Sequence, residues 1–186
     1  VYGSRIGLDK TNIAWLISVT ILGGATLHWV IGKISDHYDR RSVLSITTAM
    51  AAGLAITGFF YGQQPPTTLY IIYFFFGGFA FSLYSLSVAH VNDLLTSEQA
   101  LDASQNLLQL YGIGAILGPL VGGISMDLYG PRSLPLVYAA ALLSLLVFTF
   151  YRMLIRKAPP LEEQEPFIPV VRTSQASIDM DPRTDT

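Results

Sequence analysis

The sequence has 186 residues, 51% of them hydrophobic and only 13% charged, with a formal net charge of −2. Soluble domains carry roughly 25% charged residues, so this composition argues against a water-soluble globular protein. The absence of cysteine excludes a disulfide framework and any cysteine-based metal site. No cleavable signal peptide is recognisable, and the chain starts at Val1 in a polar stretch, which leads us to expect a fragment or a truncated reading frame.

Five apolar runs of membrane-spanning length follow one another along the chain. A helix needs about 20 apolar residues to cross a bilayer. The runs cover about residues 12–31, 43–62, 68–90, 102–125 and 134–154. Only helices and closed barrels satisfy all backbone polar groups in lipid, and the strict alternation of barrel strands is missing here. Because five such runs disfavour soluble buried helices, we predict an all-α, polytopic membrane protein with its bundle in residues 1–155.

The segment from Gly32 to Ser42 concentrates charge between two uncharged stretches. No Asp, Glu, Lys or Arg occurs in residues 11–32 or 43–92. Because Lys and Arg gather on the inner face of membranes, we predict that this segment is a cytoplasmic turn. On that assignment the inner segments contain Lys33, Arg40, Arg41, Arg152, Arg156 and Lys157, and the outer ones contain Arg5, Lys10 and Arg132. The excess of inner charge also predicts a cytoplasmic C-terminus.

Polar segments separate the later runs. Two prolines in the segment from Gln63 to Thr67 are expected to stop the second helix, because proline cannot continue one. Thr96 and Gln99 fit a capping box at the start of the fourth helix. Residues 156–186 are dominated by proline, acids and small polar residues, so we predict a disordered cytoplasmic tail and leave a partner-binding role open.

The charged turn also contains a motif whose physical role can be inferred from its residues. Gly32 allows close approach of a neighbouring helix, and Asp36 is an anion suited to a helix N-terminus across a bundle seam. With Arg40 and Arg41 they resemble the loop motif of the major facilitator superfamily, Gly-x-x-x-Asp-(Arg/Lys)-x-Gly-(Arg/Lys)-(Arg/Lys), with His37 and Asp39 as departures. The resemblance implies a conformational latch; a plain positive-inside loop is the alternative.

A second motif lies in the fourth run, within YGIGAILGPLVGG. Small residues at four-residue spacing let helix backbones pack closely in lipid, and proline invites a kink. The motif residues are Gly114, Gly118, Pro119, Gly122 and Gly123. They resemble the Gly-Pro motif in the fifth and eleventh helices of facilitator antiporters. The upstream glycine of that motif is Gln105 here, so antiport is not inferred.

Together with the turn from Tyr129 to Arg132, these motifs resemble one six-helix facilitator half without its first helix. The C-terminal half, helices eight to twelve, fits best, and GLDKTNIAWLISVTILGG, FSLYSLSVAHVND and LQLYGIGAILGPL are similar to the YcaD-like bacterial branch. The resemblance implies a multi-pass protein of the bacterial inner membrane. It also implies transport of a small solute by alternating access, with a missing N-terminal half or a companion bundle as partner. A non-transporting remnant or a half-transporter is the alternative.

Polar side chains at mid-depth are the candidates for contact with a solute. By the same resemblance, the first, third and fourth predicted spans face a central cavity near the bilayer midplane. The candidates are Gln109, Asn106, Tyr111, Tyr84 and Ser85, with Gln109 as the first to test. Hydrogen bonding between helices is the alternative role for most of them.

An enzymatic function is not predicted. Ser87, His90 and Asp93 lie three residues apart on one helix face, but at a membrane edge and without an oxyanion hole nearby. His90 and Asp93 alone offer too few ligands for a metal site. A phosphate-binding P-loop is absent, which argues against an ATP-driven pump. We therefore expect no catalytic residue, cofactor, metal or nucleic-acid partner.

Overall fold

The computed structural model describes residues 1–61, 66–93, 95 and 97–155. Within these ranges the chain is helical and contains no strand, so the predicted all-α class is confirmed. The helices are α1 (Tyr2–Arg5), α2 (Lys10–Ser35), α3 (Arg40–Tyr61), α4 (Pro66–Asn92), α5 (Ser97–Tyr129) and α6 (Ser133–Ile155). All but α1 contain a stretch long and apolar enough to span a membrane.

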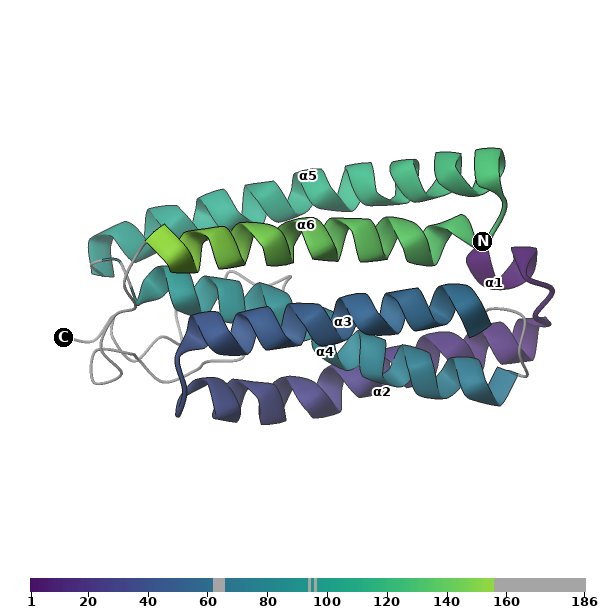
Figure 1. Cartoon of the computed structure of the whole chain (residues 1–186), viewed down its shortest axis with the longest axis horizontal. Coiled ribbons are helices and arrows are strands. Elements are labelled where there is room, and N and C mark those ends of the chain that lie inside the picture. The colour runs from purple at the N-terminus through teal and green to yellow at the C-terminus, as the bar shows by residue number, and fades with distance from the viewer. Residues whose placement is uncertain (62–65, 94, 96, 156–186) are drawn as a thin grey trace.

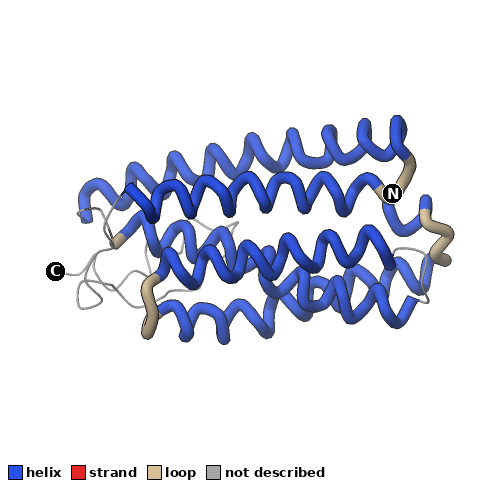
Figure 2. The backbone as a smooth tube through the Cα atoms, viewed as in Figure 1, coloured by secondary structure: helices blue, strands red, loops and turns tan. Residues whose placement is uncertain are grey.

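The long helices run side by side, and the described loops lie at the two ends of the bundle (Figures 1 and 2). Helix α4 packs mainly against α2 and α3, and α6 packs against α3. Helix α5 lies beside α6 and touches α4 only sparingly. A bundle built this way leaves most of the α5 surface without a protein neighbour in the described chain.

Each long helix starts or ends beyond its predicted run. Helix α2 continues to Ser35 and α3 begins at Arg40, so the predicted turn from Gly32 to Ser42 is helical except for residues 36–39. Helix α4 begins at Pro66, so the prediction that Pro66 and Thr67 belong to the turn is wrong. Proline suits the first turn of a helix, because its missing amide hydrogen has no intrahelical partner there. Helix α5 begins at Ser97, earlier than the predicted run. Thr96 of the proposed capping box, the segment 62–65 and the tail 156–186 lie outside the described residues.

Close packing of α2 on α4 depends on two adjacent glycines on each helix, and each of them faces a residue of the partner helix. A Cβ atom built at Gly23 would collide with the backbone carbonyl of Phe74, and one at Gly77 would collide with that of Thr20. In lipid, where burial of apolar surface gives little drive to associate, such backbone contact is what holds helices together. Gly24 and Gly78, next to these two, are also buried. Helices α2 and α4 therefore form the tightest contact of the bundle.

Candidate functional site: a buried charge cluster at the end of α2, α3 and α4

The charge cluster centres on Arg40, the first residue of α3. Its guanidinium contacts the carboxylate of Asp93 at 3.1 Å and that of Asp36 at 3.3 Å. The side chains of Arg40 and Asp93 are only 2% and 1% exposed, whereas that of Asp36 is 28% exposed. Burying a charge away from water is costly unless an opposite charge lies beside it. Here the two carboxylates offset the cost of burying the Arg40 guanidinium. The cluster joins three helices, since Asp36 caps α2 and Asp93 follows α4.

Local structure explains how the chain delivers Arg40 to this position. Asp39 accepts a hydrogen bond from the backbone amide of Arg41 at 3.1 Å and one from the hydroxyl of Ser42 at 3.3 Å. A side-chain acceptor of this kind stabilises the start of a helix. Asp39 does not have a positive φ, so the departure from glycine at this position does not require a left-handed turn. In place of a glycine turn, the Asp39 side chain caps the start of α3.

Gly32 and Arg41 complete the predicted loop motif. Gly32 is buried, and its carbonyl accepts a hydrogen bond from the amide of Asp36 at 3.2 Å. Arg41 is 9% exposed, and its carbonyl accepts a hydrogen bond from Ser45 at 2.8 Å. The structure thus gathers all four motif residues at one end of the bundle. Two of the four, Arg40 and Asp36, form an ion pair with each other.

Asp93 is the functional candidate that sequence reasoning missed. In the sequence it stands alone after a long uncharged run and forms no recognisable motif with the distant loop. Its one signal was that it is the first charged residue after that run. The bundle brings it to Arg40, 53 residues earlier in the chain. The same pairing removes Asp93 from any Ser/His/Asp set, and Ser87 donates its hydroxyl to the carbonyl of Leu83 at 2.7 Å.

The Gly-Pro motif occupies an open face of α5. Cβ atoms built at Gly114, Gly118 and Gly123 would meet nothing within 4 Å, whereas one at Gly122 would lie 2.7 Å from Leu134. Pro119 lies within the continuous helix. In the described chain the motif therefore makes one helix contact, to α6, and leaves the rest of its small-residue face uncovered.

The cavity candidates separate into two groups. The rings of Tyr84 and Tyr111 lie 5.5 Å apart between α4 and α5, at an angle of 59°. Ser85, next to Tyr84, is buried with 2% exposure. Gln109 and Asn106 are exposed and precede Tyr111 by two and five residues, which places both amides roughly 140–160° around α5 from the Tyr111 ring. The structure brings the tyrosines together but not the amides.

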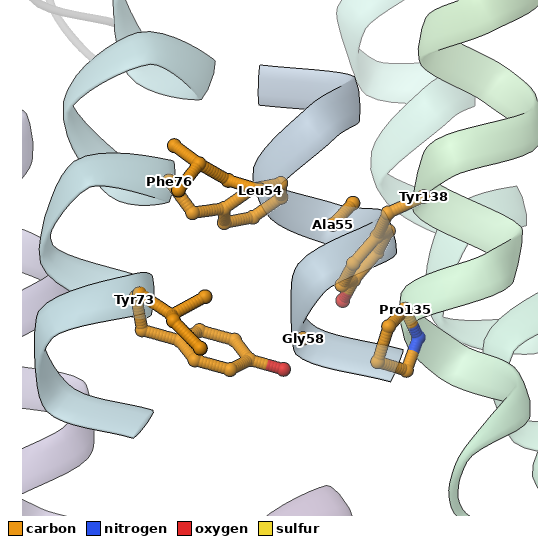
Figure 3. Close-up of a pocket in the computed structure, with 8 residues that line it drawn as sticks. Leu54, Ala55, Gly58, Tyr73, Phe76, Pro135 and Tyr138 are labelled. Atoms are coloured by element: carbon orange, nitrogen blue, oxygen red, sulfur yellow. The ribbon is translucent and has the colours of Figure 1, made fainter. Parts of the chain in front are cut away.

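A small, shallow hollow lies near the other end of the bundle, between α3, α4 and α6 (Figure 3). It is lined by Leu54, Ala55, Gly58, Ile72, Tyr73, Phe76, Pro135 and Tyr138. The rings of Phe76 and Tyr138 are stacked across it, with centroids 5.7 Å apart. Apart from two phenols the lining is apolar, so the hollow suits helix packing better than it suits a charged ligand. Among the described residues, no group of three or more His, Asp or Glu side chains could hold a metal ion.

Comparisons with known proteins bear directly on this arrangement. The family model described as Major Facilitator Superfamily matches residues 1–178. An uncharacterised MFS-type transporter of Yersinia enterocolitica is 27% identical over 91% of this chain and 41% of its own length. One from Enterobacter is 27% identical over 85% and 39%. The uncharacterised MFS-type transporter YcaD of Escherichia fergusonii is 25% identical over the same shares.

The chain spans about two fifths of the length of these curated relatives. No solved structure matches it. The similarity to the YcaD-like branch that the sequence motifs indicated is confirmed.

Proposed function

The chain belongs to the major facilitator superfamily, and from this membership we propose that it acts as the C-terminal bundle of a secondary transporter for a small solute. It is a multi-pass membrane protein of a transporter family, which does not favour an enzyme. In the proposed mechanism, two bundles rock about a central site, which opens to each side of the membrane in turn. The proposed location is a bacterial inner membrane, with the charge cluster and the C-terminus on the cytoplasmic side.

The observation that carries this proposal is the buried ion pair between Arg40 and Asp93. Intramembrane or membrane-edge charges are costly, and they persist where they serve a function. Asp36 is the more exposed partner and sits on the same guanidinium, so it can leave without abandoning Arg40 in a buried, unpaired state. We assign it the role of a latch: it is engaged in one conformation and released to a partner helix in the other.

Contact with the solute is assigned first to Tyr84 and Tyr111. Their rings meet where α4 and α5 approach each other, and the apolar runs on both helices contain no Asp, Glu, Lys or Arg at mid-depth. Such a surface offers aromatic faces and hydroxyl groups but no countercharge. In this half of the cavity, recognition would then rest on stacking and hydrogen bonds, and Gln109 and Asn106 would face away from it.

The second bundle is a required partner in this proposal. Gly114 and Gly118 form an open small-residue face on α5, and small faces in lipid are where helices approach each other. The relatives extend well beyond the region that this chain matches, which supplies a candidate for that partner. A half-transporter that recruits a separate bundle fits the same open face. A remnant that no longer transports would leave the face to lipid.

A transport assay with a matched pair of variants tests the proposal. The chain, alone and co-expressed with the unmatched part of the Escherichia fergusonii YcaD protein, would be reconstituted in vesicles and tested against a panel of small solutes. Uptake by the pair that falls at least tenfold in Asp36→Asn, but not in the control Asp9→Asn, supports both transport and the latch. Asp9 is an exposed N-cap of α2, and asparagine caps a helix about as well as aspartate. Uptake unchanged by Asp36→Asn refutes the latch, and no uptake of any solute favours the remnant.

Orientation is tested separately by chemical labelling. The chain has no native cysteine, so a single introduced cysteine can be labelled without background. A cysteine at the exposed Tyr38 should react only from the cytoplasmic side, and one at the exposed Leu128 only from the other side. The reverse pattern would overturn the proposed orientation.

A further inference from the structure

Helix α1 makes its contacts at the end of the bundle opposite the charge cluster, beside the α5–α6 turn (Figure 1). We call this the far end. Arg5 of α1 forms an ion pair of 2.6 Å with Asp127, which lies near the end of α5. Tyr2, also in α1, lies against Tyr73 of α4, with ring centroids 6.1 Å apart. One turn of helix therefore touches two long helices that barely touch each other.

Apart from the contact with α1, few contacts restrain the end of α5 near Asp127 in the described chain. Leu128 and Tyr129, the residues that follow Asp127, are 69% and 81% exposed. Near Asp127, Gly122 faces Leu134, so α5 is tied there to α6. Two routes therefore connect this end of α5 to α4 in the described chain: one through α6, whose Tyr138 stacks on Phe76, and one through α1.

The two contacts differ in strength, and this difference suits a reversible device. The side chains of Arg5 and Asp127 are 37% and 64% exposed, and exposed ion pairs of this kind are weak and easily broken. Tyr2 is the firmer anchor, because its ring lies against Tyr73 of α4 and its hydroxyl is buried. The chain between α1 and α2 contains Gly7 with a φ of +86°, a conformation that glycine adopts without strain.

We propose that α1 is a clasp that closes the far end of the bundle. Tyr2 keeps it seated on α4, and the ion pair between Arg5 and Asp127 engages or releases α5. Its place in a transport cycle rests on the proposed function. In one state the clasp closes the far end while Asp36 is released from Arg40. In the other state Asp36 is engaged and the clasp is open. The clasp itself is a property of this chain and requires no solute.

Distance measurements on the intact chain test the clasp directly. Spin labels would be placed at cysteines introduced for Phe60 at the end of α3 and Leu128 at the end of α5, each 69% exposed. Arg5→Gln removes the ion pair, and Arg132→Gln removes an exposed positive charge at the same end as a control. The double exchange Arg5→Asp with Asp127→Arg restores an ion pair of opposite sense.

The expected result is a distance distribution that shifts to longer values in Arg5→Gln, while Arg132→Gln leaves it unchanged and the double exchange recovers it. Identical distributions in Arg5→Gln and Arg132→Gln would overturn the clasp. So would a fall in thermal stability without any change in distance, because that is the mark of a merely structural contact. A clasp that responds, together with a co-expressed pair that takes up no solute, would refute the transporter proposal alone. Uptake by the pair with an unresponsive clasp would refute the clasp alone.

Discussion

Replacing Asp93 by asparagine should cost far more stability than the same change at Asp36. Removing one partner of a buried ion pair typically costs about 3–5 kcal/mol, because the other charge stays buried without compensation. Arg40 is 2% exposed, but it keeps Asp36 at 3.3 Å, so the lower end, about 3 kcal/mol, applies to Asp93→Asn. Asp36 is 28% exposed and leaves the stronger pair intact, so Asp36→Asn should cost about 1 kcal/mol or less.

The assay is reversible unfolding in mixed micelles, followed by tryptophan fluorescence. Both tryptophans, Trp15 and Trp29, lie on α2, which contributes Asp36 to the cluster. A double-mutant cycle with Arg40→Met and Asp93→Leu isolates the pairwise contribution. Because the double variant buries no unpaired charge, it should be more stable than either single variant, with a coupling of about 1–3 kcal/mol.

The reasoning fails if Asp93→Asn and Asp36→Asn cost the same, since burial would then not decide the strength of the pair. It also fails if the cycle gives a coupling below about 0.5 kcal/mol, the level at which independent sites are additive. Asp127→Asn serves as the exposed reference and should change stability by no more than about 0.5 kcal/mol.

Three further changes test the packing and the proposed contacts. Gly77→Ala should destabilise the chain by about 1–3 kcal/mol, since its Cβ would collide with the backbone of Thr20. Gly53→Ala, in open space, should instead stabilise α3 by about 0.5–1 kcal/mol. Equal effects of the two changes in unfolding experiments would contradict the close contact of α2 and α4. Gly118→Leu should leave the stability of the chain within about 0.5 kcal/mol but lower co-purification with the unmatched part of YcaD several-fold, and undiminished co-purification would exclude this face as the docking surface. Tyr111→Ala should raise the KM for uptake at least tenfold while Tyr138→Ala does not, and a KM unchanged by Tyr111→Ala would remove the tyrosine pair from the solute site.

The helices were predictable because the length of an apolar run is a local property that the bilayer itself dictates. The partners of each helix were not. The glycines of α5 and those at Gly23 and Gly77 have similar local patterns, yet only the latter meet another backbone. Which face of a helix finds a neighbour depends on the whole bundle. For the same reason Asp93 showed no relation to the loop motif until α4 was placed beside α2 and α3.

The two ends of the bundle differ in how they join the same helices. At the charge cluster, a buried pair that is costly to break holds α3 to α4, and the more exposed Asp36 joins α2 to them. At the far end, α5 is joined to α4 through an exposed pair that is cheap to break. Between them, backbone contact fixes α2 on α4, while α5 has open glycines on its inner face. Movement is therefore easiest for α5 relative to α4, and it should begin at the far end, where the weakest contact lies.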